Sequence, residues 1–199
     1  VTRWANRLTG RSDAATFAVT EEARATIRGA AARRAEVLVH GIDVAGTSAR
    51  PAGERERIRA ELGLAYDDVV IGTVANFRAQ KDYPNLLAAA ARLVERGVRF
   101  RLVAVGQGPL EAEITRRRDE LGLADHVILA GFRSDAVAVM AACDVFVLAS
   151  AWEGLPVAVM EALALGLPIV ATRVGGVAEA LDDANAVLVP PREPGALAD

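Results

Sequence analysis

The stretch 149–167 reads A-S-A-W-E-G-L-P-V-A-V-M-E-A-L-A-L-G-L and predicts a loop followed by a helix. Pro156 suits the first turn of a helix, because the N–H that proline lacks would be unpaired there. Gly166, with a proline two residues later, marks the other end. Between these two points Glu161 is the only polar side chain.

A helix that is apolar on every side is expected to be buried, so the Glu161 carboxylate needs hydrogen-bond donors. An unpaired buried charge would be strongly destabilising. The sequence leaves two possible sources of these donors for Glu161. An arginine of the protein could pair with Glu161 inside the apolar layer, or a ligand could supply the donors. A ribose is the most economical ligand, because its diol offers two hydroxyl donors to one carboxylate.

The rest of the chain alternates short apolar runs with helical stretches. Strands are expected at 69–74, 100–105, 127–129, 145–148, 169–171 and 187–189, and helices at 83–96, 110–121, 136–142, 156–165 and 177–181. Apolar strands separated by helices indicate a parallel sheet that is covered on both faces. With right-handed crossovers, the sequence predicts an α/β fold with a doubly wound, Rossmann-like sheet.

The first forty residues have a different pattern. Helices are expected at 2–8 and 21–35, a strand at 16–19 and a second short apolar run at 37–39. One strand with two helices cannot close a core, so residues 1–40 are predicted to be the tail of a preceding α/β domain. Residues 41–66 would then connect it to the main domain at 67–199. Because the chain starts with Val and stops in P-G-A-L-A-D, where a helix begins, we expect a fragment.

Composition limits the functional classes. The chain has 199 residues, of which 52% are hydrophobic, and its formal net charge of -3 lacks the basic footprint of a nucleic-acid-binding protein. No apolar run reaches the ~18–20 residues of a membrane span, and no signal peptide opens the chain. Cys143 lies in an apolar stretch and is expected to be an inert, packed thiol, which fits a reducing cytoplasm.

Ligands of open parallel sheets bind beyond the carboxyl ends of the strands, and two of the loops expected there suit phosphate. The loop A-N-F-R-A-Q-K-D-Y places Asn76, Arg78 and Lys81 before a helix. Its cations suit a diphosphate, although a loop of solvated bases has the same composition. The loop V-G-Q-G-P-L either lets backbone at Gly106 approach a ligand or forms a tight turn. It is not G-x-G-x-x-G, because Glu111 occupies the third glycine's place.

Two further loops carry candidate contacts for a base and an anion. In A-G-F-R-S-D, Phe132 and Arg133 either flank a flat base or Phe132 packs in the core. In W-E-G-L-P, Gly154 and Leu155 expose backbone amides at a helix N-terminus, which is a ready anion site, and Glu153 places a carboxylate beside them.

These loops, in this order, resemble the group 1 (family 4) retaining glycosyltransferases of the GT-B fold. The resemblance runs from Ala15 to the C-terminus and includes two glutamates separated by seven residues, Glu153 and Glu161. It also rests on the segments H-G-I-D, N-F-R-A-Q-K-D, V-G-Q-G-P-L, A-G-F, E-G-L-P and V-G-G-V-A-E. It implies the C-terminal, donor-binding domain of a GT-B fold, preceded by the end of the N-terminal domain.

The resemblance also implies a role for each matched residue. Glu161 would hold the ribose of a nucleotide-sugar donor, and Glu153 would orient the transferred sugar. Arg78 and Lys81 would bind the diphosphate and support catalysis. The remaining donor contacts are implied for Gly154, Leu155, Phe132, Arg133, Asn76 and Gly106. Two positions depart from the family pattern: Asn76 stands where many relatives carry an arginine, and His40 where an asparagine is common.

The implied activity is transfer of a hexose from a UDP- or GDP-linked donor to a glycan, lipid or small-molecule acceptor, with retention of anomeric configuration. No metal or other cofactor is expected, since the chain has no Asp-x-Asp. The expected location is the cytoplasm, with contact to the inner face of the membrane through the missing domain. A nucleotide-sugar epimerase and a non-catalytic binding module are the alternatives. The fragment alone is expected to bind donor weakly and to turn over little.

Overall fold

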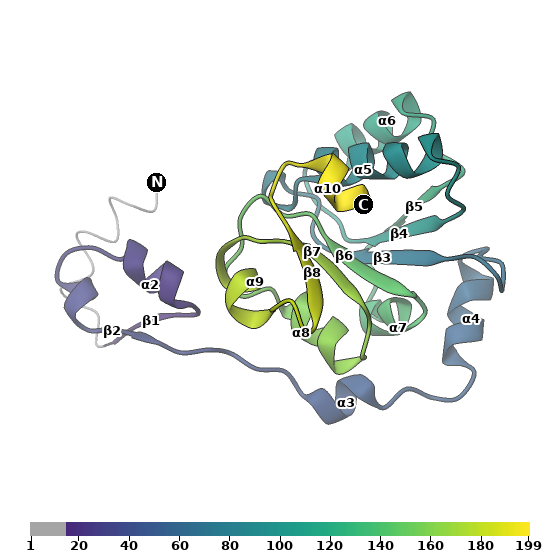
Figure 1. The fold of residues 1–199 in the computed structure, drawn as a ribbon. Coiled ribbons are helices and arrows are strands. Elements are labelled where there is room, and N and C mark those ends of the chain that lie inside the picture. The colour runs from purple at the N-terminus through teal and green to yellow at the C-terminus, as the bar shows by residue number, and fades with distance from the viewer. Residues whose placement is uncertain (1–14) are drawn as a thin grey trace.

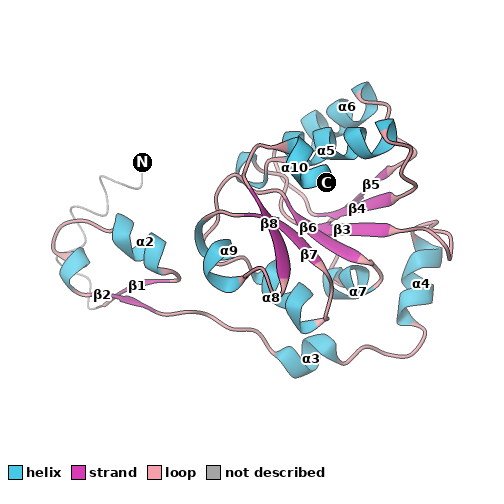
Figure 2. Cartoon of the chain, viewed as in Figure 1, coloured by secondary structure: helices cyan, strands magenta, loops and turns pink. Residues whose placement is uncertain are grey.

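A six-stranded parallel sheet forms the centre of the structure, a computed structural model that describes residues 15–199 (Figure 1, Figure 2). Its strands are β3 (Val70–Val74), β4 (Arg101–Val105), β5 (Val127–Gly131), β6 (Val145–Leu148), β7 (Ile169–Thr172) and β8 (Ala186–Val189). They lie in the order β5-β4-β3-β6-β7-β8, and all neighbouring pairs are parallel. The sheet grows outward in both directions from β3 and β6, which confirms the predicted doubly wound α/β class.

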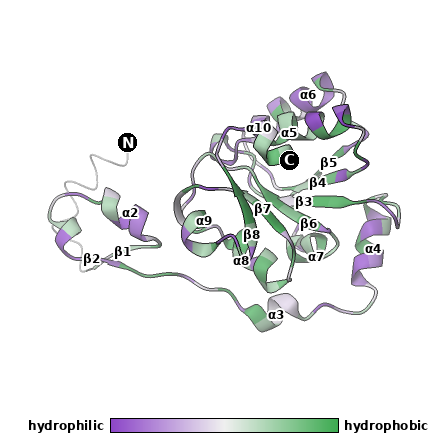
Figure 3. Cartoon of the chain, in the orientation of Figure 1, coloured by the Kyte–Doolittle hydropathy of each residue, from purple (hydrophilic) through white to green (hydrophobic). Residues whose placement is uncertain are grey.

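Helices cover both faces of this sheet. One face carries α5 (Tyr83–Glu95), α6 (Glu111–Glu120) and α10 (Pro194–Ala198), and the other carries α4 (Glu54–Glu61), α7 (Ala136–Ala141) and α8 (Val157–Ala164) (Figure 1). The remaining helix of the sheet domain, α9 (Gly175–Ala180), lies on the side that faces the N-terminal segment. The strands of the sheet are mostly hydrophobic, whereas α4 and α6 carry hydrophilic residues (Figure 3). No helix in the described residues has the length and apolar composition to cross a membrane.

The predicted elements of the main domain are confirmed. All six strands and the five predicted helices are present, with boundaries that differ from the expected ones by two residues or fewer. Cys143 is 2% exposed and its thiol donates to the Val139 carbonyl at 3.2 Å. The packing of this thiol is therefore confirmed, and burial raises its pKa to about 12, which disfavours the reactive thiolate.

The N-terminal segment differs from the prediction. The predicted helix at 21–35 is wrong, because α2 (Glu21–Thr26) ends at Ile27, whose backbone is extended. A 3-10 turn and the strand β2 (Ala35–Val37) follow, and β2 pairs in parallel with β1 (Thr16–Ala18). The second short strand is therefore at 35–37 rather than 37–39. The physical reason is Gly29, which takes a left-handed φ of 75° and interrupts the alanine- and arginine-rich run. The predicted helix at 2–8 lies outside the described residues.

Part of the predicted interdomain connection packs into the main domain. Residues 41–66 contain α3 (Val44–Ser48) and α4, and α4 contacts α7. Ile58 of α4 is fully buried in one cluster with Val70 of β3 and Val139 of α7. The core of the sheet domain therefore begins before residue 67.

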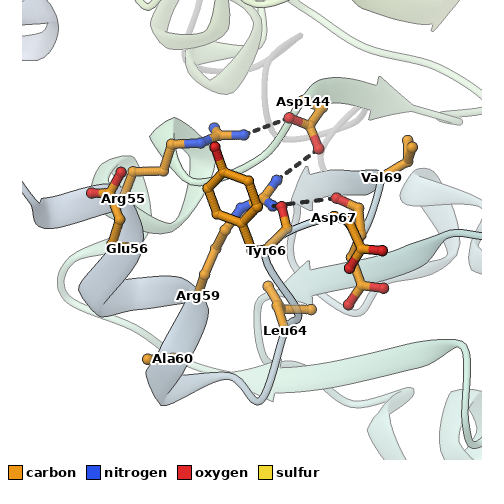
Figure 4. Close-up of a pocket in the computed structure, with 10 residues that line it drawn as sticks. Arg55, Glu56, Arg59, Ala60, Leu64, Tyr66, Asp67, Val69 and Asp144 are labelled. Carbon is orange, nitrogen blue, oxygen red and sulfur yellow. Dashed lines mark hydrogen bonds and ion pairs between the residues drawn. The ribbon is translucent and has the colours of Figure 1, made fainter.

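A buried arginine fastens α4 to the amino end of the sheet, beside a pocket of about 530 Å³ (Figure 4). Arg59 donates to four backbone carbonyls and to Asp144 Oδ2, the last at 2.7 Å. Arg55 reaches Asp144 Oδ1 at 2.5 Å, and the Val70 N–H donates to Oδ2 at 2.8 Å. Burial raises the pKa of Asp144, but the Val70 N–H and the two guanidinium groups outweigh it and hold the pKa below its usual value.

We therefore expect Arg59→Ala to lower the free energy of unfolding by about 3 kcal/mol, because the change leaves Asp144 and the carbonyls without their shared donor. The control is Arg57→Ala on the same helix. The Arg57 guanidinium is exposed and pairs with Glu61 at 3.5 Å, so its loss should cost about 0.5 kcal/mol or less. Urea denaturation of both variants measures the difference. Equal effects would contradict the role of Arg59.

The same cluster predicts an acid dependence of stability. Since the folded-state pKa of Asp144 is lowered, its contribution is fully present above the unfolded pKa of about 3.9 and is lost as the pH falls through the folded value. Urea midpoints of the wild-type chain should therefore fall below about pH 4. This decline should be shallower in Arg59→Ala, and equal slopes would contradict the proposed origin.

Candidate functional site

The loops after the parallel strands lie along one edge of the sheet, and hydrogen bonds join three of them. The Ala151 N–H, after β6, donates to the Gln80 carbonyl, after β3, at 2.9 Å. The Phe77 N–H donates to the Gln107 carbonyl, after β4, at 3.0 Å. The structure thus brings the predicted phosphate loop at 76–81 beside the predicted anion loop at 153–155.

Glu153 and Lys81 form a buried ion pair in the middle of this edge. Lys81 Nζ lies 2.5 Å from Glu153 Oε1, and the two side chains are 17% and 5% exposed. The Ser150 hydroxyl also donates to Oε1, at 2.6 Å, and the Gln80 amide donates to Oε2, at 3.0 Å. Both carboxylate oxygens of Glu153 are therefore occupied by the protein, and their arrangement fixes where the ammonium of Lys81 lies.

A second layer of hydrogen bonds holds this ion pair in place. Ser150 and Thr172 are both 0% exposed. The Thr172 hydroxyl, at the end of β7, donates to the Ser150 carbonyl at 2.6 Å. This bond ties the backbone beneath the Lys81–Glu153 pair to the neighbouring strand.

Glycines let the loops at this edge approach each other at backbone distance. A Cβ on Gly175 would collide with the Glu153 carbonyl, and a Cβ on Gly176 with the Gly154 carbonyl. Gly106 has the same close relation to the Ala75 carbonyl. Packing between loops therefore accounts for Gly106, while its predicted contact with a donor stays a prediction.

Glu161 lies on α8 and has no side-chain partner among the residues that the structure describes. Its carboxylate accepts no hydrogen bond and forms no ion pair with any residue between 15 and 199. Burial alone raises its pKa above the usual value. The expectation of a fully buried helix is wrong, however: Val159 and Ala162 are buried, whereas Val157 is 45% exposed. Only one face of α8 packs on the sheet, and Glu161 is partly accessible.

Donor groups of the protein also stay unused at this edge. Within the described part of the chain, the N–H groups of Gly154 and Leu155 donate to no protein acceptor. They precede α8, whose N-cap residue Pro156 provides no side-chain cap. Arg78 and Asn76 are exposed, and Arg78 forms no ion pair within residues 15–199. Free amides at a helix N-terminus beside a free guanidinium and a fixed ammonium can bind a diphosphate.

The predicted base contacts lie on the loop after β5. Phe132 is 69% exposed, so its alternative placement in the core is wrong. The guanidinium of Arg133 pairs with Asp135 at 2.7 Å and with Glu61 of α4 at 2.5 Å, and hydrogen bonds to these carboxylates raise its pKa. Because this guanidinium is already engaged, a contact with a base stays a prediction for the Phe132 ring and the backbone of the loop.

Sequence reasoning did not single out Gln80, Ser150 or Thr172. Gln80 and Ser150 adjoin residues that were singled out, but nothing in the sequence indicates that their side chains point at Glu153. The same holds for the Lys81–Glu153 pair, whose members are 72 residues apart. In the described residues, no group of three or more His, Cys, Asp or Glu side chains is arranged to hold a metal ion.

The chain is also similar to known proteins. The family "Glycosyl transferases group 1" matches residues 54–199. The chain is 40% identical to the putative glycosyltransferase EpsF of Bacillus subtilis over 138 residues, which is 69% of this chain and 35% of that protein. It is 33% identical to the 2-deoxystreptamine glucosyltransferase of Streptomyces kanamyceticus over 186 residues, covering 90% of this chain and 46% of that protein. The chain thus spans less than half of either relative.

Solved structures give the same result for the fold. Anabaena HepE in complex with UDP-glucose superimposes with a TM-score of 0.87 at 26% identity, over 98% of this chain and 55% of HepE. WaaG, a glycosyltransferase involved in lipopolysaccharide biosynthesis, superimposes with a TM-score of 0.78 at 24% identity, over 92% of this chain and 51% of WaaG. The family match covers more than half of the chain, and the chain therefore belongs to the group 1 glycosyltransferases.

Proposed function

We propose that residues 67–199 hold the nucleoside diphosphate of a sugar donor and that the protein transfers the sugar to an acceptor with retention of configuration. The observation that carries the proposal is the carboxylate of Glu161, which is partly buried and receives no donor from the described protein. A ribose diol would supply two hydroxyl donors to it. Because a ribose is neutral, its binding adds no charge that a cation of the protein would have to balance.

The diphosphate is assigned to the free amides of Gly154 and Leu155, to Arg78 and to Lys81. Anions bind at helix N-termini, where unpaired N–H groups and the helix dipole point at the ligand. The crystal structures of HepE with UDP and with UDP-glucose support a uridine donor, and a GDP-linked donor stays the second candidate. The other donor contacts proposed from the sequence are Phe132, Arg133, Asn76 and Gly106.

The chemistry follows from where charge develops. As the bond between the sugar's anomeric carbon and the diphosphate oxygen breaks, negative charge grows on the diphosphate. The Lys81 ammonium and the amides are in place before the reaction and can stabilise that charge without rearrangement, and the exposed Arg78 adds a second cation at the same edge. These groups provide the positive charge in this proposal, which requires no metal. Glu153 is assigned to orienting the transferred sugar, and because its oxygens are bound by Lys81, Ser150 and Gln80 it also positions the Lys81 ammonium.

The acceptor is proposed as a glycan, a lipid-linked sugar or a small molecule. One relative from Escherichia coli, 30% identical over 144 residues, is named for transfer to a diphosphoundecaprenol-linked sugar, and the relative from Streptomyces kanamyceticus is named for 2-deoxystreptamine. Incubating the whole protein that contains this chain with labelled UDP- and GDP-sugars tests the proposal. Transfer to an acceptor supports it, whereas isomerisation of the donor would favour an epimerase. Binding without either reaction would favour a non-catalytic module.

Glu161→Ala is expected to weaken binding of UDP and of uridine alike, by about 1.5–3 kcal/mol, the range for a hydrogen bond to a charged group. Calorimetry measures both affinities. Glu113→Ala, which removes an exposed glutamate from α6, is the matched control and should leave both unchanged. Unchanged uridine affinity in Glu161→Ala would contradict the ribose assignment.

Glu161→Gln is expected to raise the melting temperature at pH 7. Burial raises the folded-state pKa of Glu161, so above its unfolded pKa the ionised carboxylate disfavours folding, and a neutral amide removes that cost. The advantage should shrink as the pH is lowered and Glu161 becomes protonated. A melting temperature that falls on substitution would show that the carboxylate has a stabilising partner.

Arg78→Ala should weaken UDP binding about tenfold and leave uridine binding and the melting temperature unchanged, because Arg78 has no partner in the described structure. Lys81→Ala should also weaken UDP more than uridine, but it should lower the melting temperature, since Glu153 then stays buried without its cation. Calorimetry and thermal unfolding separate the two variants. Equal losses for UDP and uridine would contradict a phosphate role for the substituted residue.

A further inference from the structure

The N-terminal segment packs directly on the loops to which the diphosphate is assigned. A Cβ on Gly176 would come 2.5 Å from Thr20 Cγ2, and a Cβ on Gly154 would come 3.2 Å from Val19 Cγ2. Thr20 is 2% exposed. The two residues that follow β1, Val19 and Thr20, therefore cover this part of the sheet edge.

Glu179 of α9 holds the helix that follows these two residues. Its Oε2 accepts a hydrogen bond from the Glu21 N–H and its Oε1 accepts one from the Glu22 N–H, each at 3.2 Å. These are the first N–H groups of α2, which a helix leaves without an internal partner. The side chain of Thr20 accepts the next one, from the Ala23 N–H, at 3.0 Å. The first turn of α2 is thus completed by a carboxylate of the sheet domain.

The charges around this contact show that it is specific. Glu179 meets the main-chain N–H groups of two residues that are themselves glutamates, and the Glu21 side chain is paired with Arg24 at 2.9 Å. Among the described residues, the groups that favour the approach are the two N–H groups and the positive end of the α2 dipole. General attraction between oppositely charged surfaces therefore does not explain the contact, whereas the hydrogen-bond geometry does.

The first turn of α9 is fixed against the loop that carries Glu153. Gly175 has a φ of 44° and no space for a Cβ beside the Glu153 carbonyl, and Gly176 has none beside the Gly154 carbonyl. A shift of α9 would therefore move this loop. Through α9, the position of α2 is coupled to the position of the Lys81–Glu153 pair and the free amides.

We propose that Glu179 is a positioning residue that latches the N-terminal segment over the donor loop. When its carboxylate caps α2, Val19 and Thr20 lie on Gly154 and Gly176 and close one side of the site. When the cap is lost, this segment separates from the sheet domain. The functional meaning of the latch rests on the proposed donor site, but its existence does not.

Amide hydrogen exchange of the 199-residue chain tests the contact without any ligand. In Glu179→Ala, the amides of Glu21 and Glu22 should exchange about tenfold faster, because each loses a hydrogen bond to a charged acceptor. Glu179→Gln keeps one acceptor oxygen and should lie between this variant and the wild type. Glu113→Ala on α6 is the control and should leave the α2 amides unchanged. Wild-type amides that are already unprotected would overturn the proposal.

A distance measurement separates a latch from a purely local cap. Spin labels at cysteines introduced by Arg33→Cys and Arg116→Cys, both exposed positions, report the separation between the N-terminal segment and α6. The native Cys143 is buried and should stay unlabelled. The distribution of distances between the two spin labels should be narrow when Glu179 is present and broad in the Glu179→Ala variant. Faster exchange with an unchanged distribution would show that Glu179 only caps α2, and would overturn the latch.

Adding UDP links the latch to the donor site. If UDP binds at the donor loop, it should slow amide exchange at Glu21 and Glu22 in the wild type. The slowing in Glu179→Ala should be smaller by several-fold or more. The reason is that a ligand that favours the closed arrangement is coupled to the contacts that form it. UDP that binds with no difference between the two proteins would overturn the coupling. A failure of UDP to bind at all would contradict the proposed function and leave the ligand-free exchange and distance results as the test of the latch.

Discussion

Backbone packs against backbone where the loops of the carboxyl edge meet, and the placement of the candidate donor groups depends on this close approach. At Gly175 and Gly176 the main chain of α9 touches the carbonyls of Glu153 and Gly154, so that any side chain would force the loops apart. Interiors packed at this density transmit small shifts instead of absorbing them. The loop of Glu153 therefore has one position relative to β7 and α9, and Thr172 strengthens it from below through the Ser150 carbonyl.

This rigidity has a chemical consequence. Groups that must stabilise a developing charge are most effective when they are already in place, because nothing then has to reorganise during the reaction. The Lys81 ammonium meets that condition, since Glu153, itself held by Ser150 and Gln80, determines its position. Arg78 does not, because its exposed side chain has no partner in the described structure. Of the two cations predicted from one loop, only Lys81 is held in place by the protein.

The sequence was sufficient for the sheet and insufficient for the contacts between loops. Short apolar runs bounded by glycine and polar residues identify strands such as β6 and β7 to within one residue, because a doubly covered parallel strand has to be apolar on both faces. The prediction of a helix at 21–35 is wrong, although alanine and arginine favour helix on both sides of Gly29. The chain instead turns at Gly29 in a left-handed conformation, and β2 then pairs with β1.

The candidate site shows the same division. The loops that carry Lys81, Glu153 and Glu161 were predicted, since ligand groups collect at the carboxyl ends of parallel strands. The sequence does not show which of these charged groups is paired within the protein. The Lys81–Glu153 pair depends on the directions of two side chains that are 72 residues apart in the sequence. Even the burial of α8 was overestimated. The composition of one helix does not show that its far side carries Val157 at 45% exposure.

The two glutamates of the motif are in opposite electrostatic states, and this difference indicates how binding energy divides along the donor. Glu161 has no donor among the described residues, so in the proposed function a ribose would gain its hydrogen bonds in full in both the ground state and the transition state, which would contribute affinity. The Lys81 ammonium is already paired with Glu153 before a donor binds. In the proposed complex, a diphosphate in the ground state would therefore compete with the Glu153 carboxylate for this ammonium. In the proposed reaction, charge would grow on the diphosphate and not on Glu153 as the bond to the sugar breaks, and the fixed ammonium would then interact more strongly with the leaving group. An interaction that strengthens only at that point lowers the barrier instead of tightening the ground state. In the proposed enzyme the ribose end therefore holds the donor, and the Lys81–Glu153 pair favours the transition state.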